Sequence, residues 1–288
     1  MIIWMNDYYI FDPSITGGGL MTDRNIIMKG LTEGYNIILM NPNTFDEDVL
    51  NEAELVIISI TRNFTKDQIK IATKMPYVIY NHDYFCKWIL FYPKIEKCKK
   101  CKYLDKELYI NSETMIWMSP IHREAWIYAF PEIEDHDYML IPSAIDTSVF
   151  YSREKIPNSV IACNQTLYKG FYNVLDYIKR HRDMTFYIYG DVYRPDLYPS
   201  NVKLLGKVPY KSLPDILSDK EYAIHLPATI QPSERFAAEA IASGCIPIFN
   251  DNVGIMSYGE DIIDLVNNAA DRFWKELRER FSLNESRR

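Results

Sequence analysis

The segment QPSERFAAEAIASGCIPIFNDN, from Gln231 to Asn252, combines charged side chains with a run of small residues and then an apolar run. Ser233 is a plausible N-cap for a helix that Gly244 ends. A helix that begins at the carboxyl edge of a parallel sheet presents free backbone N–H groups and the positive end of its dipole, which favour an anion such as phosphate. Glu239, more than one turn into that helix, could accept paired hydrogen bonds from vicinal hydroxyls, as on a ribose. The alternative is a solvated amphipathic helix with its glutamates on the exposed face.

Two other groups of residues could contribute to such a site. Three glycines, Gly17 to Gly19, follow the first apolar run and would let the backbone approach a ligand closely, or simply form a flexible loop. His82 and Asp83 come directly after the apolar run YVIY. We expect them to face a cleft, where His82 either contacts a ligand or makes structural hydrogen bonds.

The elements that must position these residues are β-type and helix-type segments that alternate, in two successive sets. Several of the β-type runs are apolar without alternation, which favours parallel strands covered on both faces. A helix is predicted near residues 22–33 and ends at Gly34. A second helix follows Gly170, and its apolar residues Phe171, Val174, Leu175 and Ile178 are spaced so that they form one buried stripe. The predicted strands are residues 1–5, 36–40, 55–60, 77–80, 114–118, 138–141, 159–162, 186–189, 222–226 and 246–249.

This order predicts the α/β class, with two Rossmann-like, doubly wound parallel-sheet domains that face each other across a cleft. Apolar periodicity lapses near residues 142–159, where prolines interrupt it. We therefore predict a first domain over residues 1–147, with a Cys/Lys-rich insertion at about 84–106. A second domain would cover residues 148–270, followed by a C-terminal helix and tail over 271–288.

Bulk composition narrows the class of protein. The 288 residues suit two domains of ordinary size, and a net charge of −7 argues against a general affinity for nucleic acid or anionic membranes. Apolar runs fall short of a bilayer span, and the N-terminal residues do not resemble a signal peptide. Five cysteines, an odd number, do not suggest a disulfide framework. We expect a cytoplasmic protein, in the host cytoplasm if the source is a phage or virus.

The stretch SERFAAEAIASGCIPIFNDNVG resembles the signature of GT-B glycosyltransferases of the large retaining group with a Glu-x7-Glu motif (glycosyl transferases group 1). The second glutamate of that motif maps to Glu239, which in the family binds the nucleotide ribose. The first, which normally touches the donor sugar, falls on Gln231, whose amide carries no charge. Glu234 is only five residues before Glu239, so it is not a simple substitute.

Four further segments match the family in order. In ACNQTLYKGFYNVLDYI, Lys169 matches the lysine that neutralises the donor diphosphate, and Asn164 stands where an arginine is expected, so Arg235 could supply the missing charge. SAIDTSVFY, FYIYGD and the glycine-containing ITGGGLMTDRN match the domain entry, a strand with Gly190, and the first loop. The resemblance assigns catalysis to Lys169, Arg235, Glu239 and His82, and donor binding to Gly18, Gly19, Asn164, Lys169, Gly190, Gln231, Ser233, Glu234, Arg235, Phe236 and Glu239.

The resemblance implies transfer of a sugar from a UDP- or GDP-sugar to a hydroxyl with retention of configuration, without a catalytic metal, since no DxD motif is evident. The acceptor would be a glycan, a lipid or a hydroxymethylated base in DNA, because YNHD and YKGFYNVLDY also resemble segments of phage enzymes that glucosylate modified DNA. Three alternatives stay open: a sugar-nucleotide epimerase of the same fold, a non-catalytic nucleotide-sugar-binding protein, and a nucleic-acid-binding protein. Product analysis, melting shifts without donor consumption, and salt-sensitive DNA binding would separate them.

A cysteine- and lysine-rich segment is foreign to this pattern. Cys98 and Cys101 form a C-x2-C pair, and with Cys86 and His82 they could hold a structural zinc ion; otherwise they are three free thiols. His82 cannot easily serve both zinc and a sugar. Lysines between residues 87 and 106, interleaved with aromatic residues, form a local basic patch that either is solvated or receives an anionic acceptor.

Overall fold

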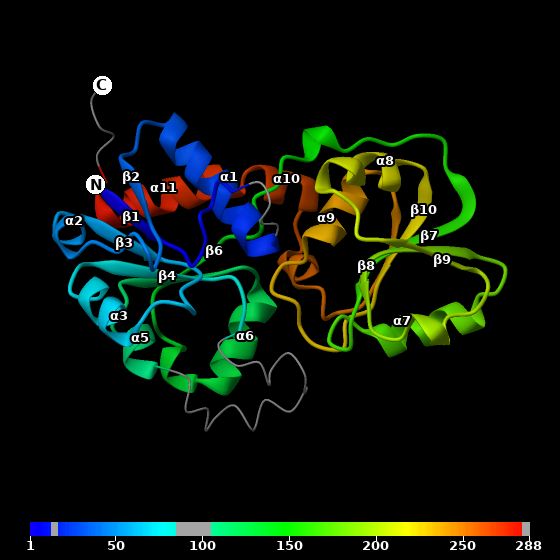
Figure 1. Cartoon of the computed structure of the whole chain (residues 1–288), viewed down its shortest axis with the longest axis horizontal. Helices are drawn as coiled ribbons and strands as arrows, with labels where there is room; N and C mark the ends of the chain where they lie inside the picture. Colours follow the sequence, from blue (N-terminus) through cyan, green and yellow to red (C-terminus); the bar gives the residue numbers. More distant parts are fainter. Residues whose placement is uncertain (13–16, 85–104, 284–288) are drawn as a thin grey trace.

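The computed structural model describes residues 1–12, 17–84 and 105–283, and Figure 1 shows two lobes side by side, each built around one sheet. The first lobe holds a six-stranded sheet in the order β2-β1-β3-β4-β5-β6, and the second holds a five-stranded sheet in the order β11-β10-β7-β8-β9. All pairings between these strands are parallel. The predicted α/β class with two doubly wound sheets is therefore confirmed.

The strands are β1 Ile2–Met5, β2 Ile37–Met40, β3 Leu55–Ile58, β4 Tyr77–Asn81, β5 Thr114–Trp117, β6 Tyr138–Leu140, β7 Ile156–Gln165, β8 Thr185–Val192, β9 Val202–Gly206, β10 Lys220–His225 and β11 Ile246–Phe249. The α-helices are α1 Gly18–Thr32, α2 Glu47–Asn51, α3 Lys66–Ala72, α5 Lys106–Ile110, α6 Pro120–Ala129, α7 Phe171–Arg180, α8 Leu213–Ser218, α9 Arg235–Ala242, α10 Ile262–Asn267 and α11 Ala269–Phe281. Short 3-10 helices are η2 Pro131–Ile133, η3 Thr147–Val149, η4 Pro195–Leu197, η5 Tyr210–Ser212 and η6 Gly254–Tyr258.

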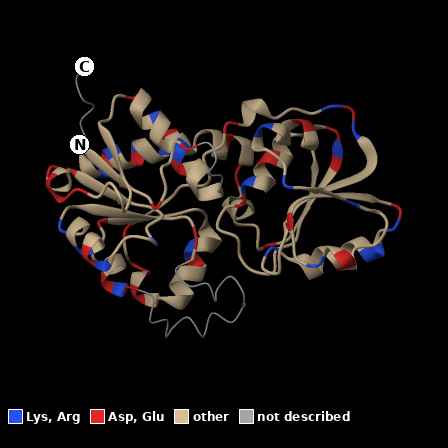
Figure 2. Cartoon of the chain, viewed as in Figure 1, with Lys and Arg blue, Asp and Glu red and all other residues tan. Residues whose placement is uncertain are grey.

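Helices cover both faces of each sheet, which explains the unbroken apolar runs. In β1, Ile2 and Trp4 pack with α1 and α11, whereas Ile3 and Met5 pack with α2 and α3 on the other face. The second sheet is built in the same way, with α9 packed on one face and α7 on the other. Charged residues of both signs are interspersed over the outer helices of both lobes (Figure 2). Because helices cover the faces of both sheets, the loops that follow the carboxyl ends of the parallel strands are the places where a ligand can bind.

Strand β9 and the start of helix α1 differ from the sequence-based expectation. Strand β9 was not predicted, because it lies at the edge of the second sheet and most of its side chains are exposed, so its apolar signal is weak. Helix α1 begins at Gly18 rather than near Thr22, with Gly17 as its N-cap. The three glycines therefore belong to the start of a helix, and the interpretation as a flexible loop was wrong.

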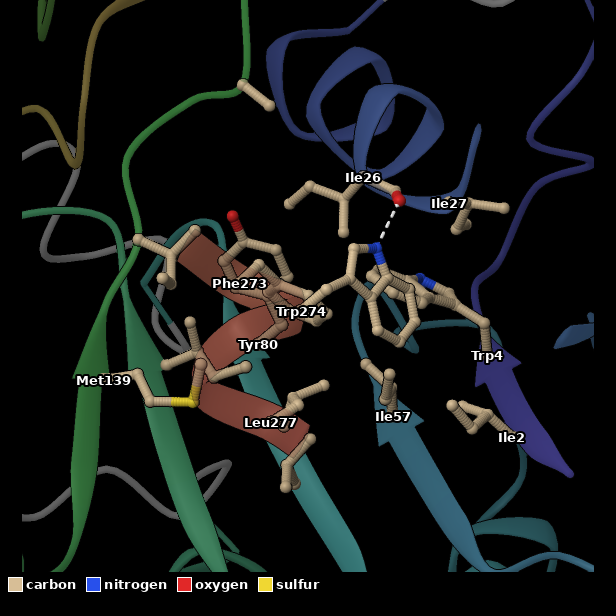
Figure 3. Close-up of a cluster of buried hydrophobic side chains, with 14 of the residues drawn as sticks. Ile2, Trp4, Ile26, Ile27, Ile57, Tyr80, Met139, Phe273, Trp274 and Leu277 are labelled. Atoms are coloured by element: carbon tan, nitrogen blue, oxygen red, sulfur yellow. Dashed lines mark hydrogen bonds between the residues drawn. The ribbon is translucent and has the colours of Figure 1, made fainter. Parts of the chain in front are cut away.

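The C-terminal helix α11 returns to the first lobe and completes its core (Figure 3). Trp274 is fully buried, its Nε1 donates a hydrogen bond of 2.7 Å to the Ile26 carbonyl, and its ring stacks on Tyr35 with centroids 4.6 Å apart. Gly30 of α1 leaves the room for this ring, since a Cβ there would lie 2.3 Å from Trp274. The chain consequently passes between the lobes twice, and the last helix is part of the first lobe's core.

Trp274→Ala is expected to lower the free energy of unfolding by about 3–5 kcal/mol, because it leaves a large cavity between α1 and α11 and removes the hydrogen bond from the indole to the Ile26 carbonyl. Urea denaturation followed by circular dichroism measures this loss. Lys275→Ala, on the exposed side of the same helix, is the matched control and should change stability by less than about 0.5 kcal/mol. Equal stability of the two variants would contradict the stabilising role of Trp274 in the first core.

Candidate functional site

A cavity of about 520 Å³ lies between the lobes, at the carboxyl edges of the two sheets. Its walls come from the start of α1 and the loops after β4 and β5 in the first lobe, and from the loops around β7 and α9 in the second. The residues assigned from sequence that line it are Gly18, Gly19, His82, Asn164, Lys169, Gln231, Ser233, Glu234, Arg235, Phe236 and Glu239. The topology thus brings together side chains that are up to 221 positions apart, from Gly18 to Glu239.

The entry into α9 differs from the predicted one. Glu234, not Ser233, precedes the first helical residue, and it does so with a left-handed backbone (φ 71°, ψ 86°) and without a side-chain cap. The Ser233 hydroxyl instead accepts a hydrogen bond of 3.2 Å from the backbone N–H of Ser143 in the other lobe. The prediction of Ser233 as N-cap was wrong, because this hydroxyl is used to join the lobes.

A buried charge cluster surrounds Glu234. Its carboxylate makes an ion pair with the Lys169 ammonium, and His225 Nε2 lies 3.1 Å from Glu234 Oε2. Burial raises the pKa of Glu234, but the charges of Lys169 and His225 outweigh burial and hold that pKa well below its usual range. Burial lowers the pKa of Lys169, and Glu234 reverses this effect, so that its pKa lies above the usual value. The cavity therefore contains a permanent cation with a built-in counter-ion.

Glu239 lies one turn further along α9 and is only 3% exposed. Tyr210 donates a hydrogen bond of 3.0 Å to Glu239 Oε1, and Arg235 Nε lies 3.4 Å from the same oxygen. Burial raises the pKa of Glu239, and Arg235 opposes that rise. The interpretation of α9 as a solvated helix with exposed glutamates was therefore wrong.

Arg235 connects this carboxylate to the other lobe. Its Nη1 donates to the Ala144 carbonyl at 2.9 Å and its Nη2 to the Tyr210 hydroxyl at 3.0 Å. Burial and the charge of Glu239 raise the pKa of Tyr210 to about 12. The Tyr210 hydroxyl is therefore protonated at neutral pH, so it can accept the hydrogen bond from Arg235 and donate its own hydrogen to Glu239. Sequence reasoning missed Tyr210, since it lies in η5 with no motif around it and is brought to Glu239 only by folding.

The two departures from the family pattern also line the cavity, and both amides are partly engaged. Gln231 donates from Nε2 to the Thr229 carbonyl at 3.0 Å. Asn164 has a positive φ of 33°, and its Oδ1 accepts a hydrogen bond of 3.0 Å from the N–H of Asp191. Gly190 is next to this amide rather than on the cavity wall: a Cβ at Gly190 would lie 2.1 Å from Asn164 Oδ1.

The first lobe contributes the N-terminus of α1 and His82. The glycines permit a close approach, since a Cβ at Gly19 would lie 3.1 Å from His82 and one at Gly18 would lie 3.5 Å from Arg235. This 15-residue helix begins at the cavity, so the N–H groups of its first turn, which have no partner within the helix, favour negative charge there. His82 hydrogen-bonds through Nε2 to Asp23 Oδ1 at 2.6 Å.

The predicted zinc site cannot be traced, because Cys86, Cys98 and Cys101 lie outside the described residues, as does most of the lysine patch. Within residues 1–12, 17–84 and 105–283, no group of three or more His, Cys, Asp or Glu side chains is arranged to hold a metal ion. Lys106, which is described, forms an ion pair with Glu132. Among the described helices, none combines the length and apolar character needed to cross a membrane.

Comparison with solved structures identifies the architecture. A sucrose-phosphate synthase from Thermosynechococcus elongatus superimposes with a TM-score of 0.65 at 13% identity, over 98% of this chain and 94% of that one. AviGT4, a glycosyltransferase involved in avilamycin A biosynthesis, gives 0.61 at 12% identity over 98% and 97% of the two chains. The chain has the GT-B fold.

A third GT-B structure is an α-glucosyltransferase in complex with UDP and a 13-mer DNA containing an HMU base; it gives a TM-score of 0.58 at 14% identity, over 98% of this chain and 90% of that one. No protein-family model matches the sequence, and a search of curated proteins finds no match. At these sequence identities the similarity shows the fold alone, and the chemistry depends on the residues that line the cavity.

Proposed function

We propose that this protein is a glycosyltransferase that moves a sugar from a nucleoside-diphosphate sugar, such as a UDP- or GDP-sugar, to a hydroxyl acceptor with retention of configuration. The observation that carries the proposal is the cavity between the lobes, where Lys169, the start of α9 and buried Glu239 line one wall. Cations suit a diphosphate, and a buried carboxylate suits the vicinal hydroxyls of a ribose. Similar GT-B structures were solved with UDP bound.

Catalysis would consist mainly of stabilising the leaving diphosphate. As the bond from the sugar to phosphate breaks, negative charge grows on the phosphate oxygens, and pre-positioned cations and helix N–H groups lower the energy of that state. Lys169 is the cation we assign to this role, with Arg235 and the N-terminal end of α9 beside it. Retention is proposed from the resemblance to the Glu-x7-Glu group.

Glu234 gives this site a property that the motif does not imply. Its carboxylate already neutralises Lys169, so an incoming diphosphate must compete with it for the ammonium group. Its left-handed backbone is a strained conformation for a residue with a side chain, and such strain is characteristic of functional positions. We therefore assign Glu234 to the donor site as the counter-ion that sets how tightly the diphosphate binds.

Glu234→Gln is expected to tighten UDP binding about tenfold, which is about 1.4 kcal/mol, because the amide no longer repels phosphate. The same change should lower the stability of the free protein by about 1–3 kcal/mol, because it leaves the part-buried Lys169 without its counter-ion. Calorimetric titration with UDP and urea denaturation measure the two effects. Asn158→Gly, which relieves a positive φ of 57° on the exposed surface, is the control and should leave UDP affinity unchanged. Weaker UDP binding by Glu234→Gln would remove the counter-ion role.

The acceptor would be a glycan, a lipid or a hydroxymethylated base in DNA. The similarity to an α-glucosyltransferase that was solved with DNA containing an HMU base supports testing hydroxymethylated DNA as an acceptor. The deciding experiment is incubation with UDP- and GDP-sugars and each acceptor class, with product mass and anomeric configuration read by mass spectrometry and NMR. An isomerised donor would favour the epimerase, and a raised melting temperature with UDP but no donor consumed would favour a non-catalytic binder. A structural zinc at His82, Cys86, Cys98 and Cys101 stays a separate proposal, which elemental analysis of purified protein tests.

A further inference from the structure

A second cavity, of about 240 Å³, lies in the first lobe beside the main one. The carboxyl ends of β3 and β4 bound it on one side, and α5 with Trp126 of α6 bounds it on the other. His82 and Asp83 line both cavities, so the two spaces meet at the loop after β4. The second cavity has less than half the volume of the main one, which suits a single ring-sized group rather than a nucleotide sugar.

Aromatic side chains form part of the wall of this second cavity. Trp126 is 1% exposed, its ring centroid lies 4.9 Å from that of Tyr109, and its Nε1 donates a hydrogen bond to His122 at 3.1 Å. The hydroxyl of Tyr84 donates to the Ile230 carbonyl at 3.1 Å. Because the polar atoms of Trp126 and Tyr84 are engaged within the chain, their rings offer apolar surface, against which the C–H face of a bound ring can pack.

Asn81 supplies an unused hydrogen-bond donor on the same side. Along β4, Tyr77 and Ile79 pack with α2 and α3, so Asn81 shares their face of the sheet, whereas Val78 and Tyr80 lie on the other face. Asn81 lines the second cavity and is only 5% exposed, and its Nδ2 has no hydrogen-bond partner among the residues that the structure describes. A buried amide without a partner costs free energy, and an oxygen atom of a bound ligand would remove that cost.

Two carboxylates of the same wall can accept further hydrogen bonds. Asp83 accepts from the backbone N–H of Tyr84 at 2.8 Å through Oδ1 and from Arg62 at 2.9 Å through Oδ2. Asp105 accepts from the backbone N–H of Leu108 at 3.3 Å. Since an ionised carboxylate has about four acceptor positions, each of the two has capacity left for the hydroxyls of a ligand.

The charge of this wall selects a neutral ligand. Among the described residues that line the second cavity, Arg62 is the one Lys or Arg side chain, and its guanidinium already pairs with Asp83. Asp7 holds the Arg62 loop in place, because its carboxylate accepts the backbone N–H groups of Arg62 and Asn63 at 2.9 Å each. A nucleic-acid backbone or a lipid phosphate needs unpaired cations, whereas a group with several hydroxyls needs acceptors and an amide donor.

We propose that the second cavity is an acceptor subsite for one neutral saccharide ring, and that the acceptor is therefore a glycan of at least two units. The ring donates hydroxyl hydrogens to Asp83 and Asp105, accepts from Asn81, and packs its C–H face on the aromatic wall. The adjoining unit presents the reacting hydroxyl in the main cavity, where the two spaces meet. This inference rests on the proposed function, because it takes the main cavity to hold the sugar donor.

Leu108→Trp tests the subsite by filling it. Leu108 is half-buried on α5 and lines the cavity, so an indole at this position occupies the space of the ring. The acceptors are glucose, galactose, mannose and N-acetylglucosamine, each as a monosaccharide and within disaccharides. For the wild type, kcat/KM with the best disaccharide should exceed that with its terminal monosaccharide by about tenfold, and in Leu108→Trp this ratio should fall to about one.

Two measurements separate this effect from damage to the rest of the protein. The affinity of Leu108→Trp for UDP should stay within twofold of wild type, since the main cavity is unchanged. Ile110→Trp is the matched control, because Ile110 is 46% exposed on the same helix and does not line the cavity. This control should keep the preference for the disaccharide. A wild type without that preference, or a Leu108→Trp protein that keeps it, overturns the subsite.

Asn81→Leu tests the unused donor. Loss of one hydrogen bond should lower kcat/KM for the disaccharide about 3–10-fold and leave the monosaccharide unaffected. The free energy of unfolding of the unliganded protein should not fall, because Nδ2 has no partner among the described residues to lose. Urea denaturation measures the stability. A variant that loses stability but keeps the kinetics with the disaccharide shows a purely structural amide and overturns the assignment.

Binding is also read without turnover, by saturation-transfer difference NMR of the four monosaccharides with UDP present. Signals in the wild type that disappear in Leu108→Trp support the subsite; no signal from any sugar, or equal signals in both proteins, overturns it. Transfer to hydroxymethylated DNA or to a lipid alone also overturns it and leaves the glycosyltransferase assignment intact. A wild-type protein that neither binds UDP nor consumes any donor contradicts the proposed function instead.

Discussion

Replacement of Lys169 by alanine is expected to reduce kcat by about 10²–10³-fold, the usual effect of removing one pre-positioned group that stabilises charge in the transition state. The reason is that Lys169 is the cavity's ammonium group opposite the expected leaving diphosphate, held there by Glu234. The loss should appear mainly in kcat, because the charge on the diphosphate grows as the bond breaks.

Rates of donor consumption at saturating donor, with and without acceptor, measure this effect. Lys179→Ala is the matched control, since this lysine lies on the exposed side of α7, the helix that follows Lys169. Because the substitution also frees Glu234, its stability should be checked by denaturation before rates are compared. A kcat within threefold of wild type in a folded Lys169→Ala protein would contradict the role in catalysis.

Glu239→Gln is expected to weaken UDP binding about 10–100-fold, because a hydrogen bond to a charged group contributes about 1.5–3 kcal/mol. The carboxylate is buried, and its neighbours Tyr210 and Arg235 hold one of its oxygens. The amide keeps the shape of the side chain but accepts through one atom only. Calorimetric titration measures the affinity, and Glu279→Gln on the exposed face of α11 is the control.

The same residue gives a pH dependence with a definite sign. Burial raises the pKa of Glu239, so the carboxylate becomes neutral at a higher pH than the ordinary value of 4.5 when the solution is acidified. UDP affinity of the wild type should therefore begin to fall while the pH is still above 4.5, and Glu239→Gln should lack this step. Equal pH profiles for the two proteins would show that Glu239 does not hold the nucleotide.

The sequence was sufficient for the architecture and for most of the wall of the site. Apolar runs without alternation predicted parallel strands covered on both faces, and Ile2 and Trp4 indeed pack on one face while Ile3 and Met5 pack on the other. The stripe of Phe171, Val174, Leu175 and Ile178 predicted the buried face of α7. These features can be predicted from the sequence because burial of one face, or of both faces, determines which neighbouring positions of the chain are apolar. Lys169 and Glu239 line one cavity because parallel strands place their carboxyl ends at one edge.

Only the tertiary structure decided which side chains pair within that cavity. Glu234 opposes Lys169 across 65 positions and Asp23 holds His82 across 59, and nothing in the local pattern around either carboxylate indicates its partner. The return of α11 to the first lobe was equally hidden, since an amphipathic helix shows that it has a buried face but not which core receives it. The local periodicity of apolar residues indicates which face of a helix or strand is buried. Which residues of other elements that face contacts depends on the path of the whole chain.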